Sequence, residues 1–95
     1  MAKFPLGQIL ATPAALAALE ESGQTPGFFI RKHAAGDWGI LSEDDRQLNE
    51  DALLDGSRLL SANMTRRGVK IWVITEATDE DGNRAATTLL LPEDY

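Results

Sequence analysis

The stretch "VKIWVITEA", Val69–Ala77, decides the fold because it carries the strongest secondary-structure pattern in the sequence. β-branched and aromatic residues alternate along it, which is typical of a β-strand. Ile71 and Val73 point to one side of such a strand. Trp72 and Ile74 point to the other side, so both faces of the strand carry apolar side chains. We therefore expect helices to cover one face of the sheet, and a partner or a curl of the sheet to cover part of the other.

Turn-forming sequences bound this strand on both sides. "TRRG" at 65–68 precedes it, and "TDEDGNR" at 78–84 follows it. The loosely alternating stretch Ser57–Met64 lies before the first turn, and the apolar stretch Ala85–Leu91 lies after the second, where Pro92 ends the pairing. Short connections between consecutive strands indicate antiparallel pairing. The second half of the chain therefore predicts a three-stranded antiparallel β-meander.

Polar caps, prolines and glycines divide the first half of the chain into three short helices. The helices start at Thr12-Pro13, Thr25-Pro26 and Ser42, and they end at Gly23, Gly36 and Gly56. In the third helix, Leu41, Leu48 and Ala52 form the apolar line that should face the core. The apolar run Gly7–Ala11 is a candidate for an additional N-terminal strand. The sequence therefore predicts an α+β fold, with short N-terminal helices followed by the three-stranded antiparallel β-meander.

Length, charge and composition limit the classes of function. The 95 residues are expected to form a single domain, residues 1–95, with one core. The net charge of -6, from 15 acidic and 9 basic residues, disfavours generic nucleic-acid binding because phosphate backbones repel such a surface. The absence of cysteine excludes disulfides, thiol catalysis and thiolate metal sites, and it fits a reducing compartment. No apolar run approaches the ~20 residues of a membrane helix, so we expect a cytoplasmic chain without membrane contact.

"KHAAGDWG", Lys32–Gly39, contains the only histidine and offers two weak catalytic candidates, His33 and Asp37. In a continuing helix their spacing would place a base beside a carboxylate that orients it. Gly36 is expected to end the helix between them, which favours a last-turn histidine near free carbonyls and an aspartate that bonds the amides of the turn. An alternative is a small hydrolase or nuclease-type toxin that uses His33 with Asp37 or Glu76. A metal site would need more ligands, so no metal and no cofactor is expected.

Charges are unevenly distributed along the sequence. The predicted third helix is rich in carboxylates, namely Glu43, Asp44, Asp45, Glu50 and Asp51. The following segment, 56–75, has four basic residues and no acidic one, with Arg66 and Arg67 adjacent in a turn. One interpretation is a solvated helix face and charged edges that discourage aggregation. The other is electrostatic docking, in which the acidic helix occupies a groove made for nucleic acid and the two arginines bind a carboxylate patch or phosphate.

The two tryptophans, Trp38 and Trp72, also allow two interpretations. Each is a candidate for the core, Trp38 at the join of helices and sheet and Trp72 within the central strand. The core is the favoured interpretation, and the alternative is an exposed anchor that binds a partner, because tryptophan is enriched at the hot spots of interfaces.

Three motifs in this order resemble a known family: "GDWG" at 36–39, "IWVITEA" at 71–77 and "LLPEDY" at 90–95. With the segments between them, they cover nearly the whole chain. They resemble a family of small bacterial proteins, mostly uncharacterised, that are encoded in chromosomes, plasmids and other mobile elements. Small proteins of such elements often counter CRISPR systems and restriction enzymes, and proteins of this kind include anti-CRISPR proteins. The resemblance therefore implies an anti-defence role, and it implies no catalytic residues.

From these patterns we predict a small acidic protein that is a binding protein rather than an enzyme. It would act as an inhibitor by occupying a surface of a protein or nucleoprotein complex. The acidic helix would supply the charge, and Trp38 or Trp72 would supply an apolar anchor. The resemblance makes a CRISPR effector or a restriction enzyme the expected partner. A structural subunit or homodimer that hides one sheet face is a further alternative.

Overall fold

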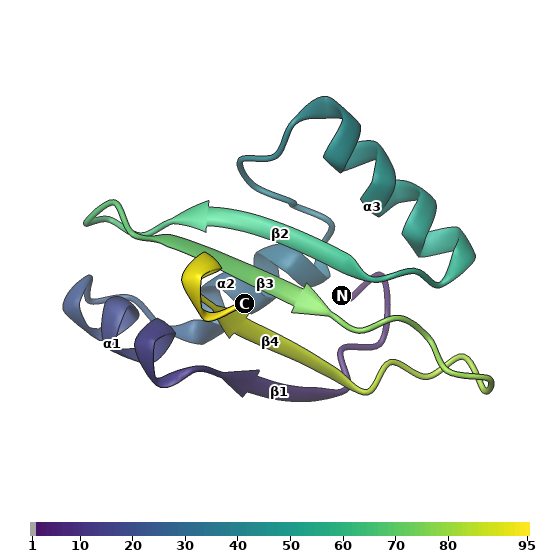
Figure 1. Ribbon diagram of the computed structural model, residues 1–95, viewed down its shortest axis with the longest axis horizontal. Helices are drawn as coiled ribbons and strands as arrows, with labels where there is room; N and C mark the ends of the chain where they lie inside the picture. The colour runs from purple at the N-terminus through teal and green to yellow at the C-terminus, as the bar shows by residue number, and fades with distance from the viewer. Residues whose placement is uncertain (1) are drawn as a thin grey trace.

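A four-stranded sheet organises the protein, which is described by a computed structural model of residues 2–95 (Figure 1). The strands are β1 (Gln8–Ala11), β2 (Leu59–Met64), β3 (Lys70–Thr75) and β4 (Ala86–Leu90). The helices are α1 (Pro13–Glu21), α2 (Pro26–Ala34) and α3 (Glu43–Asp55), followed at the C-terminus by the 3-10 turn η1 (Pro92–Asp94). The strand order is β1-β4-β3-β2. Within residues 2–95, no helix has both the length and the apolar character required to cross a membrane.

The α+β class is confirmed, but the sheet is not the three-stranded antiparallel meander that the second half of the sequence predicts. β2, β3 and β4 are antiparallel neighbours, with Val73 opposite Ser61 on one side and Leu89 on the other. β1 adds a fourth strand, which runs parallel to β4 with Gln8 opposite Ala86 and makes the sheet mixed. This pairing joins the two ends of the chain, so no local sequence pattern displays it.

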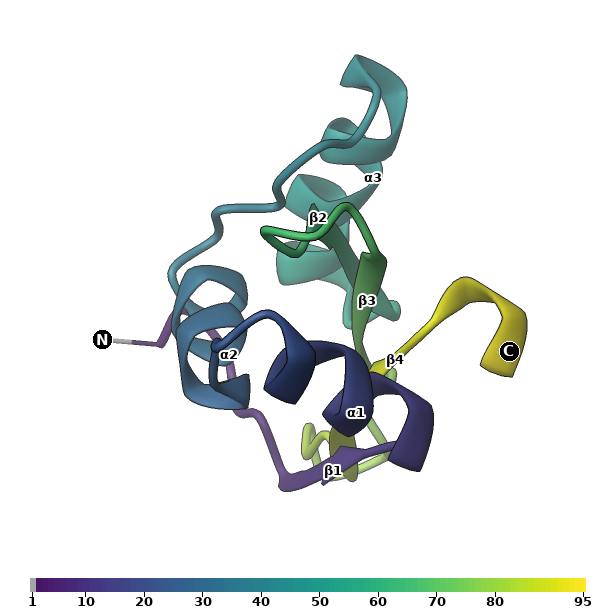
Figure 2. The ribbon, with the colours of Figure 1, turned by 90° about the vertical axis from the view of Figure 1, so that its left-hand side faces the viewer.

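α1 and α2 cover one face of the sheet (Figure 2). The core on that face consists of Ala15, Ala18, Leu19, Phe29, Ile71, Val73 and Leu89. η1 and the C-terminus lie on the opposite face, where the Tyr95 ring meets Trp72 edge-on with centroids 6.0 Å apart. Arg58 donates to the Tyr95 hydroxyl and lies over that ring. Leu10 and Met64 of this second face remain nearly half exposed, so the C-terminal segment covers only part of it.

α3 and the segment before it cover the outer edge of β2 (Figure 1). Asn49 bonds the backbone of Leu60 twice: its Nδ2 donates to the carbonyl at 2.6 Å, and its Oδ1 accepts from the amide at 3.0 Å. Beside this pair, the Ile40 amide donates to the Ala62 carbonyl at 2.8 Å. The Ala62 amide donates to the Trp38 carbonyl at 3.1 Å. These contacts satisfy backbone groups that an edge strand otherwise exposes, and they fix α3 to the sheet.

Arg84 joins the C-terminal end of α3 to the sheet. Its side chain is buried, and its Nη1 donates to the carbonyls of Ser57 and Glu76, at 2.7 and 3.0 Å. Its Nη2 donates to the Ala52 carbonyl in the last turn of α3, at 3.1 Å. Burial lowers the pKa of Arg84, an effect that the negative charge of Asp55 partly offsets. The guanidinium thereby serves carbonyls at a helix end, where positive charge also suits the helix dipole.

We expect Asn49→Ala to lower the free energy of unfolding by about 2 kcal/mol, because the amide and carbonyl of Leu60 would lose their partners. Urea denaturation followed by circular dichroism measures the change. Gln47→Ala is the matched control, since Gln47 lies on the exposed side of the same helix, where it donates to Asp51. Its loss should change stability by less than about 0.5 kcal/mol. Equal effects of the two substitutions would show that Asn49 does not hold β2.

Candidate functional site

His33 lies on the side of α2 that faces the sheet, and its side chain is 0% exposed. Its Nδ1 is 2.7 Å from the Ser61 hydroxyl, and its Nε2 is 2.9 Å from the Thr75 hydroxyl. The ring packs edge-on against Phe4 and Trp38, with centroids 5.3 and 5.6 Å away. His33 does lie in the last turn of α2, as expected, but its side chain does not turn toward the free carbonyls of that turn. The side chain turns into the core and binds two strands of the sheet.

A chain of hydroxyl groups determines which nitrogen of His33 carries the hydrogen. Thr87 donates its only hydroxyl hydrogen to the Leu6 carbonyl, at 2.7 Å. Thr87 can then only accept from Thr75, whose hydroxyl is 2.7 Å away. Thr75 must in turn accept from the Nε2–H of His33, which leaves Nδ1 to accept from Ser61. The hydroxyl chain thus places a hydrogen on Nε2, and in the neutral ring Nδ1 accepts from Ser61, so both nitrogens are bonded.

The surroundings of His33 do not suit acid–base catalysis. Burial lowers the pKa of His33 to about 4, so the ring is neutral at neutral pH. Its nitrogens bind hydroxyls, and the structure does not bring it together with Asp37 or with Glu76, which is exposed. Asp37 accepts from the Gly39 amide at 3.2 Å, which confirms its expected role in the turn. Its other oxygen lies 3.4 Å from the Nζ of Lys32.

The two tryptophans lie in different surroundings. Trp38 is 3% exposed, and its Nε1 donates to Oε2 of Glu50 at 2.8 Å. Trp38 is therefore a core residue, which contradicts the prediction that it binds a partner as an exposed anchor. Glu50 differs from the other carboxylates of α3 because it accepts from a buried side chain, so it also helps to hold Trp38 in the core. Trp72 is partly buried against Tyr95, and the rest of its ring reaches the surface.

α3 carries an acidic surface, which we define as the exposed side chains of Glu43, Asp44, Asp45, Asp51 and Asp55. Among residues 2–95, the only ion pair joins Lys32 to Asp37, so none of these five carboxylates is in an ion pair. Arg46, the single base of the helix, donates instead to the backbone carbonyls of Gly39 and Leu41, at 2.7 and 3.2 Å. The predicted acidic helix therefore presents exposed carboxylates outside any ion pair of the described chain, although the positive charge of Arg84 acts on Asp55.

Two leucines of α3 lie among these charges. Leu54 is 91% exposed and Leu48 is 65% exposed, so the expectation that Leu48 faces the core is wrong. Asn49 and Ala52 are the buried residues of this helix instead. At its C-terminal end, hydrogen bonds from Ser57 hold the pKa of Asp55 below its usual value, which keeps this carboxylate charged.

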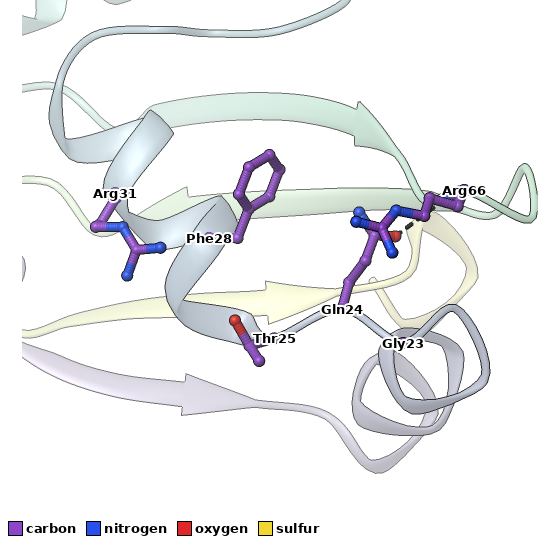
Figure 3. Close-up of a pocket in the computed structure, with 6 residues that line it drawn as sticks. All are labelled: Gly23, Gln24, Thr25, Phe28, Arg31 and Arg66. Atoms are coloured by element: carbon purple, nitrogen blue, oxygen red, sulfur yellow. Dashed lines mark hydrogen bonds between the residues drawn. The ribbon is translucent and has the colours of Figure 1, made fainter.

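Arg66 and Arg67 lie in the turn between β2 and β3, and both are exposed. The Arg66 amide donates to Oε1 of Gln24, in the link between α1 and α2, at 2.9 Å. The Arg66 side chain lines a hollow of about 210 Å³ together with Gly23, Gln24, Thr25, Phe28 and Arg31 (Figure 3). Arg67 lies outside this lining, so the structure separates two arginines that the sequence presents as one pair. Phe28 and Arg31 are lining residues that the sequence analysis missed.

The acidic turn between β3 and β4 is closed by its own hydrogen bonds. Oδ1 of Asp79 accepts from the amides of Asp81 and Asn83, both at 2.9 Å. In the described part of the chain, no three histidine or carboxylate side chains gather as they would around a metal ion. The carboxylate of Asp79 therefore serves to shape the turn.

Comparisons of the chain with protein-family models, with curated proteins and with solved structures found no match. The resemblance to small proteins of mobile elements therefore rests on the three motifs of the sequence and stays a prediction. The candidate site that follows from the geometry is the acidic surface of α3 with its two exposed leucines.

Proposed function

We propose that the protein is a small non-catalytic binding protein that docks on a basic surface of another macromolecule through the acidic surface of α3. The observation that carries the proposal is five exposed carboxylates on one helix, none of them in an ion pair within residues 2–95. Like charges this close repel one another, and a complementary basic surface relieves that repulsion on binding. Attraction between opposite charges would also steer the partners together and speed association.

Apolar side chains of α3 supply the contact at the centre of this interface, in place of the buried Trp38. Leu54 stands 91% exposed between the carboxylates. Leu48 lines a hollow of about 250 Å³, whose other lining residues are Leu41, Asp45, Asn49, Arg58 and Leu60. An apolar side chain of the partner would fit this hollow while basic groups around it bind the carboxylates.

The partner we propose is a nucleic-acid-processing complex of a host defence system, either a CRISPR effector or a restriction enzyme, met in the cytoplasm. Grooves that hold nucleic acid are lined with lysine and arginine, which complement the acidic surface of α3. The sequence resemblance to small proteins of mobile elements supports the same class of partner. Occupation of the groove would inhibit the complex by excluding its nucleic acid.

Affinity purification from lysates of strains that carry such systems tests the proposal. The test variant replaces Glu43, Asp44 and Asp45 by lysine, and the control variant replaces Glu20, Glu21 and Glu80 by lysine. Both variants change the net charge equally, but only the first reverses charge on α3. We expect the wild-type chain and the control to capture the defence complex, and the test variant to retain at most about a tenth of it.

Mass spectrometry identifies the captured protein, and circular dichroism verifies that α3 is folded in both variants. Unchanged capture by the test variant would remove the acidic surface from the proposal. Equal losses in the two variants would show that net charge, rather than α3, governs binding.

A homodimer is a second candidate, and one feature favours it. β1 is the outermost strand of the sheet, and its Ile9 and Leu10 are nearly half exposed. Gln8–Ala11 contains no charged residue that would discourage pairing with a strand of a second copy. Light scattering of the purified chain separates the two candidates, since a doubled mass supports the homodimer and a persistent monomer contradicts it.

A further inference from the structure

The hollow shown in Figure 3 lies apart from the acidic surface of α3 and carries the opposite charge. The link between α1 and α2, the helix α2 and the β2–β3 turn form its walls. Arg31 and Arg66 contribute two guanidinium groups on opposite sides of Phe28. Because the only ion pair among residues 2–95 joins Lys32 to Asp37, no carboxylate of the described chain neutralises either guanidinium.

Arg31 reaches back along α2 to the first turn of the helix. Its Nη1 lies 3.3 Å from the position that a Cβ on Gly27 would occupy. The backbone does not require glycine there, since Gly27 is outside the left-handed region, and glycine destabilises a helix relative to alanine. The missing side chain leaves room for the guanidinium beside the first turn. Two sources of positive potential, the guanidinium and the helix end, therefore lie together, and an anion would stabilise both.

Arg66 approaches the hollow from a turn whose backbone is held in place. Its amide donates to Oε1 of Gln24 at 2.9 Å. Thr65 accepts twice within the turn, at its hydroxyl from the Val69 amide and at its carbonyl from the Gly68 amide, at 3.0 and 2.9 Å. A fixed backbone reduces the entropy that the arginine loses when it binds a ligand. The backbone of Arg66 is thus fixed at the rim of the hollow, and its side chain lines the hollow.

Phe28 and Thr25 complete the lining between the two arginines. Phe28 is 45% exposed and rests edge-on against Phe29, with centroids 5.2 Å apart and an interplanar angle of 90°. The Nζ of Lys32 lies over this ring, 5.8 Å from its centroid, and the exposed part of the ring can stack against a planar ring of a ligand. The hydroxyl of Thr25 caps no amide of the described helix α2 and can bond an oxygen of a ligand.

We propose that this hollow binds a nucleoside monophosphate. Arg31, beside the first turn of α2, binds the phosphate oxygens in charge-assisted hydrogen bonds, and the base stacks on Phe28. Arg66, on the other side of Phe28, donates to acceptor atoms of the base. The volume of about 210 Å³ holds a phosphate and part of a nucleoside. A longer polyanion is disfavoured by the net charge of -6. The hollow is separate from α3, so the inference does not depend on the docking function proposed above.

Titration of the ¹⁵N-labelled full chain with adenosine 5′-monophosphate, inorganic phosphate and adenosine, followed by NMR, tests the site. We expect the nucleotide to shift the amide resonances of the residues around the hollow, phosphate to shift them with lower affinity, and adenosine to bind far more weakly. Arg31→Gln and Arg66→Gln should each weaken nucleotide binding by at least about tenfold. Arg67→Gln is the matched control, because it removes the same charge from the same turn outside the hollow. It should leave the affinity within about twofold.

Phe28→Leu separates the contact with the base from the contact with the phosphate. It should weaken binding of the nucleotide and leave binding of inorganic phosphate unchanged. Equal unfolding midpoints of the variants and the wild-type chain would show that the fold is intact, as expected for exposed side chains.

Four results would overturn the proposal. The first is a loss of nucleotide affinity in Arg67→Gln as large as that in Arg66→Gln, since binding would then depend on net charge and not on the hollow. The second is the absence of shifts around the hollow at about 10 mM nucleotide. The third is adenosine that binds as tightly as its monophosphate. The fourth is an unchanged nucleotide affinity in Phe28→Leu, which would exclude the stacked base.

Discussion

Gly39→Ala is expected to lower the free energy of unfolding by about 3 to 5 kcal/mol. Gly39 has a φ of +74°, and a Cβ there would lie 2.0 Å from the carbonyl oxygen of Ala62 and 2.8 Å from Oδ1 of Asn63. The Ala62 carbonyl has little freedom to retreat, because it accepts from the Ile40 amide. The added methyl group must therefore push the segment 38–40 away from β2.

Gly68→Ala is the matched control for this prediction. Gly68 has a φ of +82°, but nothing lies within 4 Å of a Cβ built there, so it tests the strain of the left-handed backbone alone. That strain should lower stability by about 1 kcal/mol. Urea denaturation at neutral pH measures both variants. If the two variants lost similar amounts of stability, the close approach to β2 would not be the reason that position 39 requires glycine.

The loss of stability expected for Gly39→Ala would also affect the acidic surface, because the segment 38–40 orients α3. Trp38 donates to Glu50, and Arg46 donates to the Gly39 carbonyl. Both bonds join α3 to the segment that the methyl group would displace. We infer that the "GDWG" motif acts as a structural support for α3, which is a different role from that of a reaction centre or an exposed anchor.

Features that depend on neighbours in the sequence could be predicted. Thr12 and Ser42 cap α1 and α3 as expected, and each accepts from the amide three residues further on, at 3.1 Å. Gly56 ends α3 in the left-handed conformation. β3 falls within the stretch whose alternation predicts a strand. In each case the deciding contact spans a few residues, so the sequence pattern displays it directly.

The pairing of β1 and the burial of His33 and Arg84 depend on partners far away in the chain. Two signals for His33 were nevertheless present. His33 follows Phe29 by four residues and shares its face of α2, and Thr75 lies on the same side of β3 as Ile71. A polar residue on each of two covered faces indicates a buried hydrogen bond between them, because burial without a partner is unfavourable.

The candidate site was predictable only in part. The acidic surface requires only that the carboxylates of α3 are exposed. A helix whose sequence is rich in charged residues is expected to expose them, so this part of the site could be predicted. The hydrogen bond between Trp38 and Glu50 depends on how the helix packs against the preceding segment, which the sequence does not display. The hollow brings Arg31 of α2 beside Arg66 of a hairpin turn, so it exists only once the helices have packed on the sheet.

The free energy of unfolding is expected to fall by about 3 kcal/mol as the pH is lowered from 6.5 to about 4, through the protonation of His33. The pKa of His33 is about 4 in the folded chain and 6.5 in the ordinary, exposed state. Between these values the unfolded chain binds a proton that the folded chain does not. Stability therefore falls by ~1.4 kcal/mol for each pH unit. Above pH 6.5 the contribution of His33 is complete, and below about 4 both states are protonated.

Carboxylates act in a separate and lower range of pH. The pKa values of Asp55 and Asp94 lie below the ordinary value of 3.8, because hydrogen bonds from Ser57 and Thr12 favour the charged forms. Their contributions are present above that value and are lost as the pH falls through the lowered pKa values. The fall between pH 6.5 and 4 can therefore be assigned to His33, whose ring contacts hydroxyls and aromatic rings.

His33→Gln tests this assignment, because glutamine can donate and accept hydrogen bonds but does not titrate. We expect the variant to be less stable than the wild-type chain at neutral pH and nearly constant in stability down to about pH 4.5, so that the two curves converge. Urea denaturation at a series of pH values measures both curves, and ¹⁵N NMR of the ring nitrogens reads the tautomer. A flat wild-type curve would mean that the folded ring takes up the proton as readily as the unfolded one. Burial of the ring would then not disfavour its charged form.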